Sequence, residues 1–169
     1  MLEFLQINLK KAFTAAVELN KRVNKSKQYV FLATETYNFR GKICSLPRGS
    51  KSVCSENCRA AIIFNGSLNL IKIEKLTKRD CAVGLLLVNN EKILIASVYM
   101  DIKEKTIQPW LTDVINFARR KKYSLIIGAD SNSHSVLFGN ESNSRGEELE
   151  EFIINNSLLV ENILSLIHI

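Results

Sequence analysis

Apolar runs of strand-like composition alternate with helical periodicity in the first part of the chain. Residues 3–9 (EFLQINL) and 28–34 (QYVFLAT) are short apolar runs that contain β-forming residues, and each predicts a strand. Between them, apolar residues recur at helical spacing at Ala12, Ala16, Leu19 and Val23. We therefore expect two parallel strands joined by a crossover helix.

The middle of the chain has the pattern of several short strands. Residues 59–64, 68–74, 81–88 and 92–100 are apolar or alternate with period two, and Asn89-Asn90 between the last two suits the positive φ angles of a tight hairpin turn. This pattern predicts an antiparallel meander whose last strand ends at Tyr99. Residues 39–57 precede it and are rich in Gly, Pro, Ser, Lys and Arg, so we expect a long loop that faces the substrate.

Helical periodicity returns before and after one further apolar run. We expect Thr106 to cap a helix with Pro109 in its first turn. The apolar face of that helix consists of Ile107, Leu111, Val114, Ile115 and Ala118. Residues 123–129 (YSLIIGA) predict the next strand, which ends at Asp130. Ser144 and Glu147 then predict a capping box for a last helix. Its inward-facing residues are Leu149, Phe152 and Ile153.

Polar side chains follow four of these strands where the apolar pattern ends. They are Asn8, Glu35, Tyr99 and the alternating set Asp130, Asn132 and His134. The carboxyl ends of strands in open α/β sheets are where ligands bind. Oxygen donors of this kind favour Mg²⁺ or Mn²⁺ over zinc, and the set could serve a hydrolase of phosphate esters. The alternative is that each residue is a turn residue or a helix cap, with Asp130 and Asn132 in an Asx-type loop.

Composition narrows the class of protein. The 169 residues are 46% hydrophobic, which fits one domain with its own core. We expect an intracellular, soluble protein, because no signal peptide or membrane-spanning run is evident. Its cysteines are too few for a disulfide scaffold, and we expect them to stay thiols. The formal charge of +6 is compatible with a polyanionic partner. The basic residues 119–122 are interpreted as a helix C-terminus, with phosphate contact or a nuclear address as the alternative.

Four segments resemble one known family in their order along the chain. They are LQINL, LATETY, ASVYM, and IIGADSNSHSVLFGN with the NSRGEELEEFI that follows it. Together they resemble the endonuclease domain of non-LTR (LINE-type) retrotransposons of the jockey kind. Those domains belong to the endonuclease/exonuclease/phosphatase superfamily, with apurinic endonucleases and deoxyribonuclease I. The resemblance covers residues 3–162, so we expect one domain over residues 1–162 and a divergent tail over residues 163–169.

The resemblance implies a fold and a role for each site residue. The fold would be α/β (α+β), a deoxyribonuclease I-like four-layer sandwich of two mixed β-sheets flanked by helices. Asn8 and Glu35 would flank the divalent metal, Mg²⁺ or Mn²⁺, with Glu35 as the principal ligand. Tyr99 would approach the scissile phosphate, and Asp130 would orient the attacking water. Asn132 would donate to the phosphate, and His134 would support the site.

A short motif after the His134 region also matches the family. Asn143, Arg145 and Gly146 correspond to its N-x-R-G element. We interpret these residues as structural, with substrate binding by Arg145 as the alternative.

Several positions depart from the family pattern. The chain has Thr34 and Thr36 around Glu35, Asp101 in place of a Pro, Ser135 in place of a second His, and Phe138 in place of a Trp. After Asn162 the family continues to an Asp-His pair, which the residues here lack, and His168 has no preceding Asp to replace it. We therefore expect the C-terminal strands to be missing and activity to be reduced.

The resemblance predicts a metal-dependent enzyme that nicks target DNA so that the exposed 3′-hydroxyl primes reverse transcription. Its partners would be target-site duplex DNA and a reverse transcriptase domain of the full element, with no membrane and a nuclear location. One alternative is an inactive remnant that binds DNA weakly through its basic surface. Another is a phosphoesterase of the same fold that acts on small phosphate esters.

Overall fold

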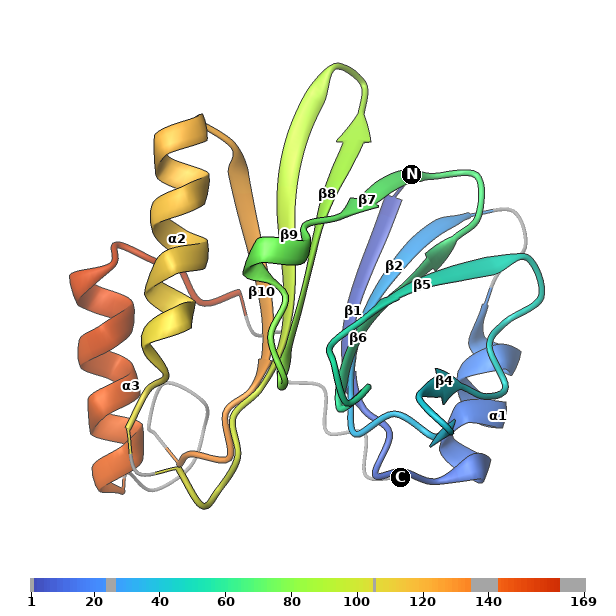
Figure 1. Ribbon diagram of the computed structural model, residues 1–169, viewed down its shortest axis with the longest axis horizontal. Helices are drawn as coiled ribbons and strands as arrows, with labels where there is room; N and C mark the ends of the chain where they lie inside the picture. Colours follow the sequence, from blue (N-terminus) through green and yellow to red (C-terminus); the bar gives the residue numbers. More distant parts are fainter. Residues whose placement is uncertain (1, 24–26, 105, 135–142, 162–169) are drawn as a thin grey trace.

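The computed structural model describes residues 2–23, 27–104, 106–134 and 143–161. Over these residues the chain forms two four-stranded sheets that lie face to face, with helices on their outer sides (Figure 1). The first sheet consists of β1 (Leu2–Asn8), β2 (Gln28–Thr34), β6 (Ala60–Asn65) and β5 (Ser50–Cys54), in that spatial order. The second consists of β10 (Ser124–Asp130), β9 (Glu91–Tyr99), β8 (Cys81–Val88) and β7 (Asn69–Lys72).

The outer layers are helical. On the first sheet lies α1 (Phe13–Arg22), and on the second lie α2 (Pro109–Lys121) and α3 (Ser144–Asn155) (Figure 1). The smaller elements are a two-stranded hairpin of β3 (Asn38–Phe39) and β4 (Lys42–Ile43), and a 3₁₀ turn, η1 (Glu74–Leu76). The expectation of a four-layer α/β sandwich is therefore confirmed.

Both sheets are mixed, and each has one parallel pair at an edge. In the first sheet β1 is parallel to β2, and in the second β10 is parallel to β9, while the other neighbours are antiparallel. The helix α1 connects β1 to β2, as predicted, and α2 connects β9 to β10. Because the paired strands are parallel, β1 and β2 end at the same edge of their sheet, and so do β9 and β10.

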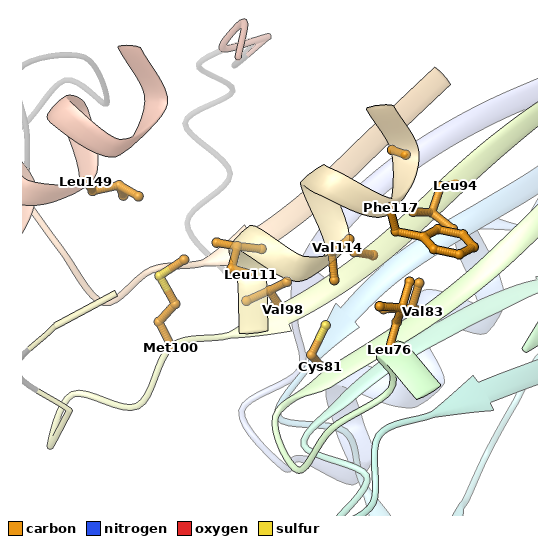
Figure 2. Close-up of a cluster of buried hydrophobic side chains, with 12 residues drawn as sticks. Leu76, Cys81, Val83, Leu94, Val98, Met100, Leu111, Val114, Phe117 and Leu149 are labelled. Atoms are coloured by element: carbon orange, nitrogen blue, oxygen red, sulfur yellow. The ribbon is translucent and has the colours of Figure 1, made fainter. Parts of the chain in front are cut away.

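Period-two alternation along the central strands divides the apolar residues among three cores. In β2, Phe31 packs against α1 while its neighbour Leu32 packs between the sheets. In β9, Ile95 likewise faces the first sheet. The third core joins the second sheet to α2 and α3, where Leu111, Val114 and Phe117 of α2 lie over Val83 and Val98 (Figure 2). Four layers therefore enclose three apolar interfaces.

The predicted four-stranded meander is wrong in one respect. The strand β6 lies in the first sheet between β2 and β5, so both of its edges are already paired. The next strand, β7, therefore cannot pair with it and begins the second sheet. The predicted loop at residues 39–57 is also partly wrong, since it includes the end of β3, all of β4 and the edge strand β5.

Two predicted helix caps need correction as well. The helix α2 begins at Pro109 with Gln108 as its N-cap, so Thr106 does not cap it. Proline suits the first helical position because its missing N–H would have no partner there. In α3 the cap is Asn143, whose Oδ1 accepts a hydrogen bond from the Gly146 amide at 2.8 Å, in place of a Ser144 and Glu147 capping box. The inward positions Leu149, Phe152 and Ile153 are confirmed.

Other expectations agree with the structure or lie outside it. Asn89 and Asn90 have φ angles of 49° and 64° in the β8–β9 turn, as predicted, and the four cysteines are free thiols. Ser135, Phe138 and His168 lie outside the described residues, so the domain boundary at residue 162 stays a prediction. Within the described ranges, no helix has the length and apolar character needed to cross a membrane.

Candidate active site

Asn8 connects two carboxylates that come from different sheets. Its Nδ2 donates to Glu35 Oε2 at 3.1 Å and to Asp130 Oδ2 at 2.5 Å. Its Oδ1 accepts from the Lys10 backbone amide at 2.7 Å, which fixes the orientation of the carboxamide. Three of the residues predicted from strand ends therefore lie in direct contact.

The Glu35 backbone has an unusual conformation. Its φ is +47°, in the left-handed region that residues other than glycine seldom occupy. Two backbone hydrogen bonds hold it there, because the Glu35 amide donates to Arg59 O and the Glu35 carbonyl accepts from the Lys11 amide, both at 2.7 Å. Strained backbone of this kind collects at functional sites. The Glu35 side chain is 24% exposed, and its Oε1 lies 3.9 Å from Lys11 Nζ.

The turn after β10 is anchored to the end of β9. The Asp130 carbonyl accepts from the Met100 amide at 2.9 Å, and Asn132 Nδ2 donates to the Met100 carbonyl at 2.9 Å. Asn132 also has a positive φ, of 48°. Thr34 Oγ1 donates to Asp130 Oδ2 at 3.4 Å from the other sheet. The Asp130 carboxylate is thus held by side chains of two strands of the first sheet.

Tyr99 is the register partner of Asp130 in the parallel pair of β9 and β10. Its side chain is nearly buried, and the guanidinium carbon of Arg59 lies 4.1 Å from the centre of its ring. Tyr99 therefore ends its strand next to Asp130, and its ring packs against Arg59.

His134 and Arg145 occupy more peripheral positions. His134 is exposed, and its carbonyl accepts from the Asn143 amide at 3.0 Å. Arg145 Nη1 donates to the carbonyls of Asp101 and Glu104, at 2.9 and 2.8 Å. These contacts agree with the structural interpretation of Arg145, and substrate binding by this residue stays a prediction.

A groove of about 1070 Å³ runs along the free edges of β1 and β10. Its polar end is lined by Asn8, Lys10, Asp130, Asn132 and His134. Further back along the strands its wall is apolar, with Leu5, Ile7, Leu125 and Ile127. The polar end thus combines a carboxylate, carboxamides, an imidazole and a cation at one surface.

The donors at this edge fit a hard divalent cation in their chemistry. Glu35 and Asp130 supply carboxylate oxygens of the kind that Mg²⁺ and Mn²⁺ prefer. The carboxamide of Asn8 turns its nitrogen toward them, so that here it orients the carboxylates, and its role as a ligand stays a prediction. Across the described ranges, no group of three or more His, Cys, Asp or Glu side chains is placed to hold a metal ion.

Three residues of this site were missed by the sequence analysis: Thr34, Lys11 and Arg59. Thr34 is a fully buried polar residue at the end of β2, and only its place next to Glu35 could have indicated it. Arg59 is a lone cation directly before an apolar strand. Its partners Asp80 and Asp101 are distant in sequence, so no local pattern connects them to it.

Comparisons with known proteins bear on the family and the fold of this chain. Residues 93–165 match the model of a family described as "Endonuclease-reverse transcriptase". The resemblance to the endonuclease domain of non-LTR retrotransposons is confirmed. Among solved structures, the "Endonuclease domain of TRAS1, a telomere-specific non-LTR retrotransposon" is similar, with a TM-score of 0.72 and 24% identity over 94% of this chain and 72% of that chain. The chain therefore has the deoxyribonuclease I-like fold. A search of curated proteins found no match.

Proposed function

We propose that this chain is a divalent-metal-dependent DNA endonuclease domain that nicks one strand of target DNA, leaving a 3′-hydroxyl to prime reverse transcription. The observation that carries the proposal is the convergence of Glu35 and Asp130 on the Asn8 carboxamide, at the edge where both sheets end. The family match and the fold support it. The substrate would be duplex DNA, the partner a reverse transcriptase domain of the same element, and the location nuclear.

Each residue has a distinct part in the proposed cleavage. Glu35 would hold Mg²⁺ or Mn²⁺, and the bound cation would neutralise charge on the phosphoryl oxygens. Asp130, fixed by Asn8 and Thr34, would accept a hydrogen bond from the attacking water and orient it. These side chains are already ordered by their hydrogen bonds in the folded chain, so none needs to reorganise during the reaction.

The remaining side chains would contact the phosphate. Asn132 uses one of its two amide hydrogens on the Met100 carbonyl, which leaves the other to donate to a phosphate oxygen. The Tyr99 hydroxyl would approach the scissile phosphate, and His134 would support the site from the exposed turn. Lys10 lines the same groove and would favour an anionic substrate.

The test is the conversion of supercoiled plasmid to open circles by the purified chain with Mg²⁺. Glu35→Ala and Asp130→Ala should each abolish nicking. The matched controls are Glu91→Ala and Asp113→Ala, which remove exposed carboxylates at the start of β9, the end opposite Tyr99, and in α2. Equal nicking by Asp130→Ala and the unsubstituted chain would refute the assignment.

The same preparation distinguishes the two alternative functions. An inactive remnant would show no nicking but would shift duplex DNA in a gel at low salt, through its positive charge. A phosphoesterase would hydrolyse p-nitrophenyl phosphate in an Asp130-dependent manner and leave the plasmid supercoiled. Either result would replace the proposed function.

A further inference from the structure

The Arg59 side chain crosses from the first sheet to the second beside the candidate site. Arg59 directly precedes β6, and its Nη1 lies 2.9 Å from Asp101 Oδ2 and 3.4 Å from Asp80 Oδ1. Asp80 precedes β8 and Asp101 follows β9, so both partners belong to the second sheet. Only 19% of the Arg59 side chain is exposed. The ion pairs therefore form a partly buried connection between the sheets.

The same guanidinium covers the ring of Tyr99. Its central carbon lies 4.1 Å from the ring centre, within the range of a cation–π contact. The Tyr99 backbone amide donates to the Asp80 carbonyl at 2.9 Å, so Asp80 contacts both members of the stacked pair. Burial acts to lower the pKa of Arg59, but interactions with Asp101, Tyr99 and Asp80 outweigh it and raise that pKa. Arg59 is thus a permanent cation over the ring.

The backbone of Arg59 meets the other side of the site. Its carbonyl accepts from the Glu35 amide at 2.7 Å, one of the two bonds that hold Glu35 at its positive φ. The Arg59 amide in turn donates to Asn57 Oδ1 at 2.9 Å, and Asn57 Nδ2 donates to Asp80 Oδ1 at 3.1 Å. One residue therefore contacts the strand end that bears Glu35 and the strand end that bears Tyr99.

One atom of Arg59 has no partner in the described part of the chain. Its Nε is buried without a hydrogen-bond acceptor. An unpaired buried donor costs stability, so charge pairing alone is a poor account of why an arginine occupies this position. The planar guanidinium stacks on the Tyr99 ring and pairs with two carboxylates at the same time. A lysine would supply the positive charge but has no planar group to stack, which explains why arginine is found here.

We propose that Arg59 is a positioning residue for phosphodiester cleavage, which fixes the ring of Tyr99 by stacking and the backbone of Glu35 through its carbonyl. It touches neither substrate nor metal in this role. The inference rests on the proposed function, since it assigns Tyr99 to the scissile phosphate. Its first part, the fixed ring, can be measured without any activity.

The first experiment places 3-fluorotyrosine at position 99 and records ¹⁹F spectra. A ring held by Arg59 flips slowly, so the two orientations should give separate resonances in the unsubstituted chain. Arg59→Lys keeps the positive charge and should merge them into one line. Arg79→Lys, a change at an exposed arginine in a nearby loop, should leave two lines. Two unchanged lines in Arg59→Lys would overturn the proposal.

The second experiment measures nicking kinetics in a double-mutant cycle. Arg59→Lys should lower kcat about tenfold or more and change KM less than about twofold, because misplacement of a reacting group acts on the chemical step. In a Tyr99→Phe background the same change should cost less than about twofold, because its effect passes through the lost hydroxyl. A general structural role would cost the same factor in both backgrounds and would overturn the proposal.

The two experiments separate this inference from the proposed function. If the unsubstituted chain nicks no DNA, the proposed function fails, while the ¹⁹F spectra still confirm or refute the fixed ring. Circular dichroism melting should show Arg59→Lys folded at the assay temperature. If it is unfolded, Arg59→Gln in the fluorotyrosine chain replaces it, with one merged line expected and two unchanged lines overturning the proposal.

Discussion

The side chains of Asn8 and Asp130 meet at 2.5 Å although 122 residues separate them in the chain. Asn8 ends β1 in one sheet, and Asp130 ends β10 in the other. Their hydrogen bond therefore exists only when both sheets are formed and correctly aligned. The candidate site is a tertiary feature of the whole sandwich.

Replacing Asn8 should affect both stability and nicking. Asn8→Ala removes the donor shared by two carboxylates and should lower the free energy of unfolding by about 1–2 kcal/mol, because these hydrogen bonds are to charged groups. Asn8→Asp adds a third carboxylate and should destabilise more without a cation, with partial recovery in Mn²⁺. Urea denaturation with and without Mn²⁺ measures both, and Asn69→Asp at the exposed start of β7 is the control. Equal effects at positions 8 and 69 would contradict the prediction.

Glu35 should account for most of the metal affinity. Glu35→Gln keeps the size of the side chain and one acceptor oxygen for Asn8 but removes the charge. It should weaken Mn²⁺ binding at least about tenfold, since even indirect contacts to a metal have effects of that size. Electron paramagnetic resonance of free Mn²⁺ gives the affinity directly and needs no catalysis. Glu91→Gln changes an exposed carboxylate at the start of β9 and should leave the affinity unchanged. Retained affinity in Glu35→Gln would remove this residue from the metal site.

Gly128 in β10 lies close against Leu32 of the facing sheet. A Cβ at this position would lie 2.6 Å from the Cβ and 2.5 Å from the Cδ1 of Leu32 in β2. Gly128→Ala should therefore lower the free energy of unfolding by about 1–3 kcal/mol through overpacking. In a Leu32→Ala background the same substitution should cost less, because the contact with Cδ1 is gone and only the one with Cβ remains. Strict additivity of the two changes in urea denaturation would contradict this account.

Cys81 should make stability fall at alkaline pH. Burial, followed by the charge of Asp80, raises the pKa of the Cys81 thiol from 9.0 to about 12. Between these values the unfolded chain loses this proton and the folded chain keeps it, so unfolding becomes more favourable as the pH rises. Cys81→Ala should flatten the pH dependence of the unfolding free energy between pH 9 and 12 relative to the unsubstituted chain. An identical slope in both would contradict the raised pKa.

Thiol labelling gives an independent check of the same burial. At pH 8 iodoacetamide should modify the partly exposed Cys44 well before Cys81, as mapped by mass spectrometry. Cys81 should react only when urea unfolds the chain. Rapid labelling of Cys81 under native conditions would show that the third core is open.

The sequence could predict those parts of the molecule that depend on local patterns. The β1–α1–β2 unit and the placement of Asn8 and Glu35 at strand ends follow from periodicity and from the rule that parallel strands end at the same sheet edge. The allocation of β6 to the first sheet could not be predicted, because it depends on which strands occupy its two edges. Three residues separate β6 from β7, a spacing that normally indicates a hairpin.

The contacts of Arg59 could not be predicted from the sequence for a similar reason. Its partners Asp80, Tyr99 and Asp101 lie on the second sheet, and only the packing of the two sheets brings them near. The prediction of the α3 cap was wrong by a single residue. Asn143 and Ser144 are both good capping residues, and a shift of one position in the backbone decides which of them caps α3.

Because Asn8 and Thr34 of the first sheet donate to Asp130 of the second, the geometry of the site depends on how the two sheets are aligned. A slip of one sheet against the other by about an ångström would part these groups without melting a strand, and a misplacement of that size can cost a large factor in rate. Apolar residues between the sheets, such as Leu32 and Ile95, then become determinants of catalysis although none can reach a substrate. Damage to that layer would leave a chain that is folded by circular dichroism and catalytically silent.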